Sequence, residues 1–143
     1  MYNQGVGVQY QMEEYNFMWN GINRRKFPRA NYTCLISIKK RLTAKTISTH
    51  TENVGAGGIC VLIKEDLGLF QGVDLELFLK ENDLPIKSGG TVVWVVKKSE
   101  PKQKGAHVYD TGIEFIDIRP EDREKLTETV EDILKTSRLS ARK

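Results

Sequence analysis

The chain has 143 residues, of which 39% are hydrophobic and 29% charged, as expected for one globular domain with one core. Its formal net charge of only +3 argues against the broad basic face that long nucleic acids require, so any basic cluster is a local feature. No apolar stretch reaches the length of a membrane span, and residues 1–11 lack the basic and apolar regions of a secretion signal, so we expect a cytoplasmic protein.

Residues 1–22 form an N-terminal extension that lacks the strand pattern of the later chain. Apolar side chains recur there at helix-like intervals, which predicts a short amphipathic helix over residues 11–20. These side chains belong to Met12, Tyr15, Met18 and Trp19. Such a helix would cap the domain or contact another chain.

The next segment, residues 24–29, reads Arg-Arg-Lys-Phe-Pro-Arg and is called the arginine segment below. Pro28 fixes its own φ and favours an extended conformation at Phe27, so the segment is not an ordinary helix surface. Arg25 and Arg29 would then lie on one side of the chain, with their Cα atoms roughly 13 Å apart. Guanidinium groups fork onto phosphate oxygens or onto guanine edges. The segment therefore predicts a site for a compact anion, with a solvated basic cluster as the alternative.

Short strands follow in quick succession. Alternating or β-branched apolar residues predict strands at residues 32–39, 45–52, 59–63, 73–79, 91–96 and 106–116. Turn-like segments separate them, notably Asn53–Gly58, whose three glycines supply positive φ angles, and Lys87–Gly90. Because no helices intervene, we expect a mainly β fold, an antiparallel barrel of six strands or a sandwich.

A helix completes the domain. Pro120 suits the first helical position, and Glu121 and Asp122 lie where the helix dipole favours negative charge. One apolar stripe along this helix should pack on the barrel. It consists of Leu126, Val130, Ile133 and Leu134. We expect the barrel and helix to occupy residues 23–135, and residues 136–143 to form a flexible basic tail.

These features together resemble the PilZ domain, a bacterial receptor domain for the second messenger cyclic di-GMP. Residues 25–29 match its RxxxR motif, and residues 53–58 resemble its D/N-x-S-x-x-G motif. Residues 90–94 resemble its G-x-V-x-W strand, and residues 112–115 its G-x-x-F strand. The resemblance covers residues 23–134 and implies a six-stranded split barrel with a C-terminal helix.

The resemblance also implies a cyclic di-GMP site. Arg25 and Arg29 would be its main ligands, Asn53 would meet a guanine edge and Gly58 would shape the turn. Gly55 stands where the family usually has Ser, so one hydroxyl contact is absent. A missing neutral hydrogen bond costs about 1 kcal/mol, up to about tenfold in affinity, which would weaken binding without abolishing it.

Arg24 directly precedes RxxxR, and arginine there resembles the type of PilZ domain that binds an intercalated pair of ligands. Stacking of a guanidinium plane on a purine is physically reasonable. The resemblance therefore leaves open whether one or two cyclic di-GMP molecules bind.

The remaining chemistry-bearing residues favour structural roles. Cys34 and Cys60 lie in apolar strands and are expected to be buried thiols. His50 and His107 lack partners at metal-ligand spacing. Trp94 is expected in the core, because Val92 and Val96 share its face by alternation. No nucleophile motif or P-loop is present, so we expect neither an enzyme nor a metal or cofactor.

The sequence thus predicts a cyclic di-GMP receptor that changes conformation, or its contacts with an unidentified effector protein, when it binds the messenger. The alternative is a PilZ-like adaptor that binds no nucleotide and acts through protein contacts in motility or pilus assembly. A small-barrel binder of nucleic acid polymers is less favoured, because the strands lack exposed aromatic platforms. Downstream partner, affinity and oligomeric state stay open.

Overall fold

The computed structural model describes residues 28–80, 83–100 and 102–141 of the chain, with side chains through residue 137. The elements are β2 (Arg29–Asn31), β3 (Leu35–Lys40), β4 (Thr46–Gly55), β5 (Gly58–Ile63), β6 (Gly72–Phe78), β7 (Ile86–Ser99), β8 (His107–Ile116) and α1 (Pro120–Ala141). The helix expected over residues 11–20 lies outside the described residues, as do Arg24 and Arg25.

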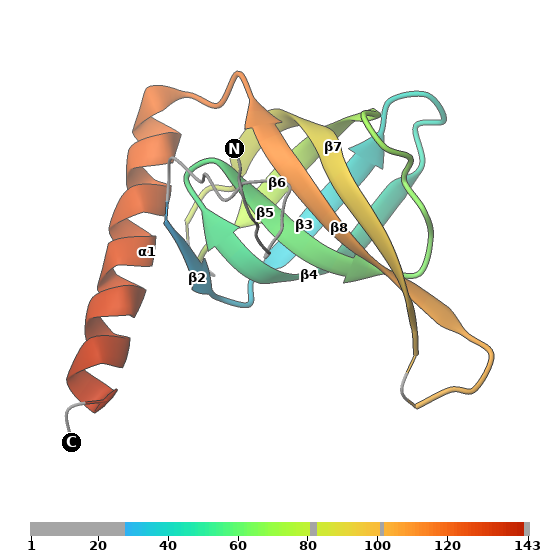
Figure 1. Ribbon diagram of the computed structural model, residues 1–143. Coiled ribbons are helices and arrows are strands. Elements are labelled where there is room, and N and C mark those ends of the chain that lie inside the picture. The colour runs from blue at the N-terminus through green and yellow to red at the C-terminus, as the bar shows by residue number, and fades with distance from the viewer. Residues whose placement is uncertain (1–27, 81–82, 101, 142–143) are drawn as a thin grey trace, which may run out of the picture.

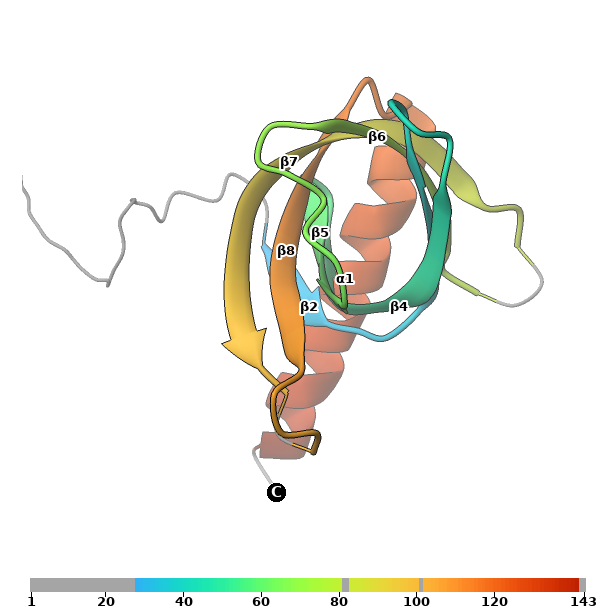
Figure 2. The ribbon, with the colours of Figure 1, turned by 90° about the vertical axis from the view of Figure 1, so that its right-hand side faces the viewer.

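Six of the strands close into an antiparallel barrel (Figures 1 and 2). Their order is β4-β3-β6-β7-β8-β5, and pairing between β4 and β5 closes the ring. The short strand β2 is added to the far half of β4. The prediction of a six-stranded antiparallel barrel is therefore confirmed, and closure removes the exposed edges that a sandwich would leave.

The barrel interior is filled by the inward-facing apolar residues of the strands. Ile36 and Ile38 of β3 are fully buried, whereas Leu35, which directly precedes Ile36, is 44% exposed. Opposite them, Leu77 of β6 pairs with Ile36 and is also fully buried. The period of two that was visible in the sequence thus separates the core from the outer face.

The first strand, predicted at residues 32–39, begins later than expected, at Leu35. A break at residues 32–34 separates it from β2, a strand that the sequence pattern did not predict. Within this break the Thr51 hydroxyl accepts a hydrogen bond from the Cys34 backbone N–H at 3.0 Å and donates to the Tyr32 carbonyl at 2.7 Å. A buried side chain thereby replaces ladder bonds that the strand gives up. The break separates β2, which begins with Arg29, from the barrel strand β3.

Two glycine-containing segments that were predicted as turns are mostly strand. Lys87–Gly90 lies inside β7, and only residues 56 and 57 of the second motif form a turn. Among described glycines only Gly68 and Gly105 have positive φ. The glycines of these segments instead give space, since a Cβ on Gly90 would lie 2.7 Å from a methyl group of Ile113. The prediction that they supply positive φ angles is wrong.

Helix α1 packs beside β2 and β4 and continues past the barrel (Figure 1). Leu126 and Val130 of the predicted stripe are buried, and Ile133 and Leu134 are half-buried. The helix runs to Ala141, beyond residue 135 where we expected it to end. The described part of the chain contains no candidate transmembrane helix.

Candidate functional site

Strand pairing brings one row of residues together across the outer face of five strands. Asn31 of β2 pairs with Asn53 of β4, and Asn53 pairs with Cys60 of β5. Gly112 of β8 pairs with Cys60 on one side and with Trp94 of β7 on the other. Directly opposed residues of an antiparallel sheet lie on the same face, so these five positions form one continuous surface.

A second row lies next to the first. Arg29 of β2 pairs with Gly55, Gly55 with Gly58, and Gly58 with Glu114 of β8. Thr91 of β7 ends the row. The two rows place four of the predicted site residues, Arg29, Asn53, Gly55 and Gly58, on neighbouring strands.

Arg29 links the two rows. Its side chain lies over Gly55, where a Cβ would be 2.9 Å from Cγ of Arg29 and 2.8 Å from the Pro28 carbonyl oxygen. The Nη1 group donates a long hydrogen bond of 3.4 Å to Oδ1 of Asn53. The guanidinium carbon also lies 5.2 Å from the ring centroid of Trp94, within cation–π range. Absence of a side chain at Gly55 therefore creates the space that Arg29 occupies.

Trp94 lies on this outer face and not in the core, so that prediction is wrong. A register shift between Val92 and Trp94 interrupts the alternation of β7. Val92 is buried in the core, whereas Trp94 is half-buried beside Arg29. A Cβ on Gly112 would be 2.3–2.4 Å from three atoms of the Trp94 ring, which thus lies flat on the glycine. A β-bulge of this kind redirects a side chain to the opposite face.

Asp110, which the sequence did not single out, holds the edge of the tryptophan. Its Oδ1 accepts hydrogen bonds from Nε1 of Trp94 at 3.3 Å and from Sγ of Cys60 at 3.0 Å. Its Oδ2 forms an ion pair with Nζ of Lys98 at 3.2 Å. The carboxylate is thereby the centre of a network that joins β5, β7 and β8. The position of Asp110 within a predicted strand gave no indication of this role.

The network shifts the pKa values of both the Asp110 carboxyl and the Cys60 thiol. Burial raises the pKa of the Asp110 carboxyl, but hydrogen bonds from Cys60, Trp94 and Lys98 and the Lys98 charge outweigh it, so the net pKa lies below its usual value. Burial, together with the hydrogen bond to Asp110, raises the pKa of the Cys60 thiol to about 12. Cys60 is therefore a protonated donor and not a reactive thiolate, which agrees with the predicted structural thiol.

We expect Asp110→Asn to lower the free energy of unfolding by about 1 kcal/mol at pH 7, because Lys98 and Cys60 lose a charged acceptor. A carboxyl group with a lowered folded-state pKa stabilises the protein above its unfolded pKa, about 3.9. This stabilisation is lost as the pH falls through the folded-state pKa. Urea unfolding of parent and variant at pH 7 and near pH 3 measures the difference. An equal difference at both pH values would contradict the role of the charge.

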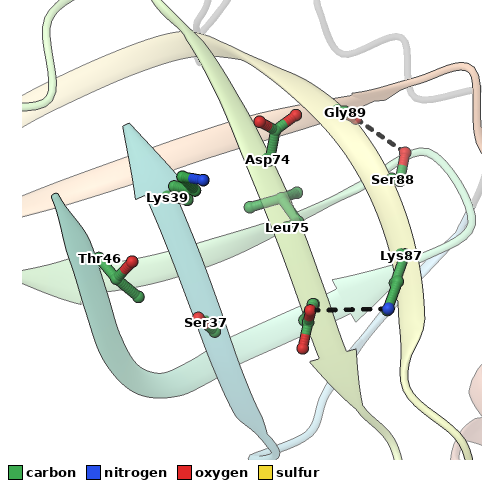
Figure 3. A pocket seen from close by; sticks show the side chains of 9 residues that line it. Ser37, Lys39, Thr46, Asp74, Leu75, Lys87, Ser88 and Gly89 are labelled. Carbon is green, nitrogen blue, oxygen red and sulfur yellow. Dashed lines mark hydrogen bonds and ion pairs between the residues drawn. The ribbon is translucent and has the colours of Figure 1, made fainter. Parts of the chain in front are cut away.

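The described surface is hollowed in at least two places. One hollow, of about 450 Å³, adjoins the rows at Asn53 and is polar. Its lining comprises Asn31, Thr33, His50, Thr51, Glu52, Asn53 and Leu62. A second, of about 430 Å³, lies over β3, β6 and β7 (Figure 3). Arg29 is not among the residues that line it. It contains both signs of charge, including a Lys87–Glu76 ion pair at 4.0 Å, which does not favour an anion.

A family model described as "PilZ domain" matches residues 23–132. The chain belongs to the PilZ domain family. The match spans the arginine segment, the barrel and most of α1, so the resemblance inferred from the two motifs is confirmed. No curated protein matches this sequence.

Solved structures share the PilZ fold at low sequence identity. The inhibitor of motility MotI/DgrA of Bacillus subtilis is 23% identical, with a TM-score of 0.60 over 78% of this chain and 51% of that one. The PilZ domain of YcgR from Escherichia coli, solved with c-di-GMP, is 13% identical, with a TM-score of 0.63 over 85% of this chain and 99% of that one. The K. pneumonia MrkH–c-di-GMP complex is 14% identical, with a TM-score of 0.67 over 83% of this chain and 56% of that one. This chain thus spans about half the length of MotI/DgrA and MrkH.

In this PilZ domain the four described motif residues gather on one face. Arg29, Asn53 and Gly55 lie together on β2 and β4, and Gly58 begins β5 beside them. A Cβ on Gly58 would lie 2.2 Å from the Ile113 carbonyl oxygen, so the glycine permits close approach of β8. Its role is therefore strand packing as well as the end of a turn.

Proposed function

We propose that this PilZ domain is a receptor for cyclic di-GMP without enzymatic activity, acting in the bacterial cytoplasm. The observation that carries the proposal is the position of Arg29, whose guanidinium lies between Asn53 and the Trp94 ring. Cationic, amide and aromatic groups then meet on one surface, next to a polar hollow. These are the groups that bind phosphates, base edges and base faces, respectively.

In the proposed complex, Arg25 and Arg29 bind phosphate or guanine edges, Asn53 bonds to a guanine edge and Trp94 offers a face for stacking. The Arg29–Asn53 bond is long at 3.4 Å, and bonds from a guanidinium to phosphate are shorter and stronger. Replacement of the long Arg29–Asn53 bond by a guanidinium–phosphate bond therefore favours the bound state. Gly55 and Gly58 let the arginine and the strands approach closely.

The proposed output is a change in the N-terminal extension. A ligand held by both Arg25 and Arg29 would join the arginine segment to the barrel wall, and residues 1–20 end three residues before that segment. A ligand shifts a conformational equilibrium through its different affinity for the two states. The position of residues 1–20, and hence their contact with an effector protein, would then depend on the messenger. Arg24 would favour binding of a ligand pair.

Isothermal titration of the whole chain with cyclic di-GMP tests the proposal. We expect saturable binding at micromolar concentration or below, with a stoichiometry of one or two ligands per chain that reports on Arg24. GMP, which has one base and one phosphate, serves as the control ligand. Absence of binding heat at any ligand concentration up to the millimolar range would overturn the proposal.

Gly55→Ser is expected to weaken cyclic di-GMP binding by about tenfold, although it restores the serine usual in PilZ domains. The new Cβ would lie within 3 Å of both the Pro28 carbonyl oxygen and Cγ of Arg29, so β2 must shift. Overpacking of this kind costs about 1–3 kcal/mol. Titration of parent and variant measures the change, and stronger binding by the variant would show that the lost hydroxyl matters more than the space.

One observation favours a second candidate, an adaptor that acts without nucleotide. Arg29 contacts Asn53 and Trp94 of the same chain, so its guanidinium has amide and aromatic partners within the protein. An adaptor would capture the same protein partner from a bacterial lysate with or without cyclic di-GMP, whereas capture by the receptor would change when the messenger is added.

A further inference from the structure

Glu114 lies on the candidate site face of β8. Its neighbours Ile113 and Phe115 are buried in the core, so the exposed Glu114 side chain points outward. It occupies the row that begins with Arg29, and the two positions between them, Gly55 and Gly58, carry no side chains. Three strand spacings separate the Cα atoms of Arg29 and Glu114 by about 14 Å. The row therefore has a cation at one end and a carboxylate beyond two glycines.

The two carboxylates that β8 places on this face, those of Asp110 and Glu114, differ in how many of their acceptor oxygens are already used. Asp110 already accepts from Trp94 and Cys60 and pairs with Lys98. Glu114 forms no hydrogen bond or ion pair with any residue that the structure describes. Its two oxygens are thus available to a ligand that brings its own donors.

The chemistry of the ligand decides which part can approach Glu114. A carboxylate repels the phosphates of a cyclic dinucleotide, so a favourable contact must come from a base. The Watson–Crick edge of guanine presents two adjacent donors, N1–H and N2–H₂, which match the two acceptor oxygens of a carboxylate. The same edge of adenine presents one donor and one acceptor, so one carboxylate oxygen would face a lone pair.

We propose that Glu114 binds the Watson–Crick edge of a guanine and selects guanine over adenine in the bound dinucleotide. This inference rests on the proposed function and adds to it the residue that sets base preference. Asn53 alone discriminates less, because an amide offers one donor and one acceptor and can adapt to either purine. A carboxylate adds a repulsive element against the wrong base.

Titration of the parent and Glu114→Gln with cyclic di-GMP and cyclic di-AMP tests the assignment. Glutamine replaces one acceptor by a donor, so it opposes guanine and matches adenine. We expect cyclic di-GMP affinity to fall about 10- to 100-fold and cyclic di-AMP affinity to stay equal or rise. Glu114→Ala should lose cyclic di-GMP affinity without a gain for cyclic di-AMP. Glu128→Gln, on an exposed position of α1, removes the same charge and should leave the affinity ratio unchanged.

The outcomes separate this inference from the proposed function. A parent that prefers cyclic di-GMP, with the same preference in Glu114→Gln, overturns the role of Glu114 and leaves the receptor intact. A parent that binds both dinucleotides equally also overturns it. A parent that binds neither overturns the proposed function itself. Because Glu114 is exposed, both variants are expected to fold, and their melting curves should match the parent within a few degrees.

Discussion

Arg29→Ala is expected to weaken cyclic di-GMP binding by about 1–3 kcal/mol, roughly 5- to 150-fold in affinity. The substitution removes the group that lies between Asn53 and Trp94, together with its charge. Arg25→Ala should cause a loss of similar size, as expected from the PilZ motif. Isothermal titration of each variant against the parent measures the change.

The chain offers a matched control for the arginine variants. Arg41, a half-exposed arginine in the turn after β3, donates Nε and Nη2 hydrogen bonds to Asp74 of β6 at 3.0–3.1 Å. Arg41→Ala removes the same charge and should leave the affinity unchanged. Arg29→Lys keeps the charge but loses the planar fork, so it should fall between parent and alanine. Binding that survives both Arg25→Ala and Arg29→Ala would remove the arginine clamp from the mechanism.

Leu126→Ala is expected to lower the free energy of unfolding by about 2–5 kcal/mol. Leu126 is the fully buried residue of α1 that joins the barrel core, so its truncation removes apolar contacts and leaves a cavity. The helix packs beside β2 and β4, the strands that hold Arg29 and Asn53. Weaker packing of α1 should therefore also make the positions of Arg29 and Asn53 less fixed.

Urea unfolding of Leu126→Ala and Leu84→Ala provides the comparison. Leu84 is 84% exposed, so the same chemical change there should alter stability by no more than about 0.5 kcal/mol. Equal losses in both variants would show that α1 contributes little to the core. A larger loss for Leu126→Ala, with weaker cyclic di-GMP binding near the midpoint of unfolding, would agree with the structure.

Local sequence patterns were enough for most of the fold. The alternation around Ile36 and Ile38 identified a barrel strand, and Pro120 marked the first residue of α1. Arg29, Asn53 and Gly58 were found through two short motifs, and the structure brings them onto adjacent strands. The roles of the motif residue Arg25 and of Arg24 before it stay a proposal, because both residues precede the described part of the chain.

Trp94, Gly55 and Asp110 show where sequence patterns were insufficient. Strict alternation placed Trp94 with Val92 in the core, but the bulge in β7 turns it toward Arg29. The sequence showed only that Gly55 lacks a hydroxyl, and its contacts add that it provides space for Arg29.

The amino-acid sequence by itself determined the six barrel strands, the terminal helix, the membership of the PilZ family and the motif residues, because each depends on neighbours within a few positions of the chain. Only the tertiary structure decided which face Trp94 occupies, what the glycines make room for, and that Asp110 joins three strands. Those features depend on the register between strands far apart in sequence, and a shift of one residue moves a side chain to the other face of the sheet.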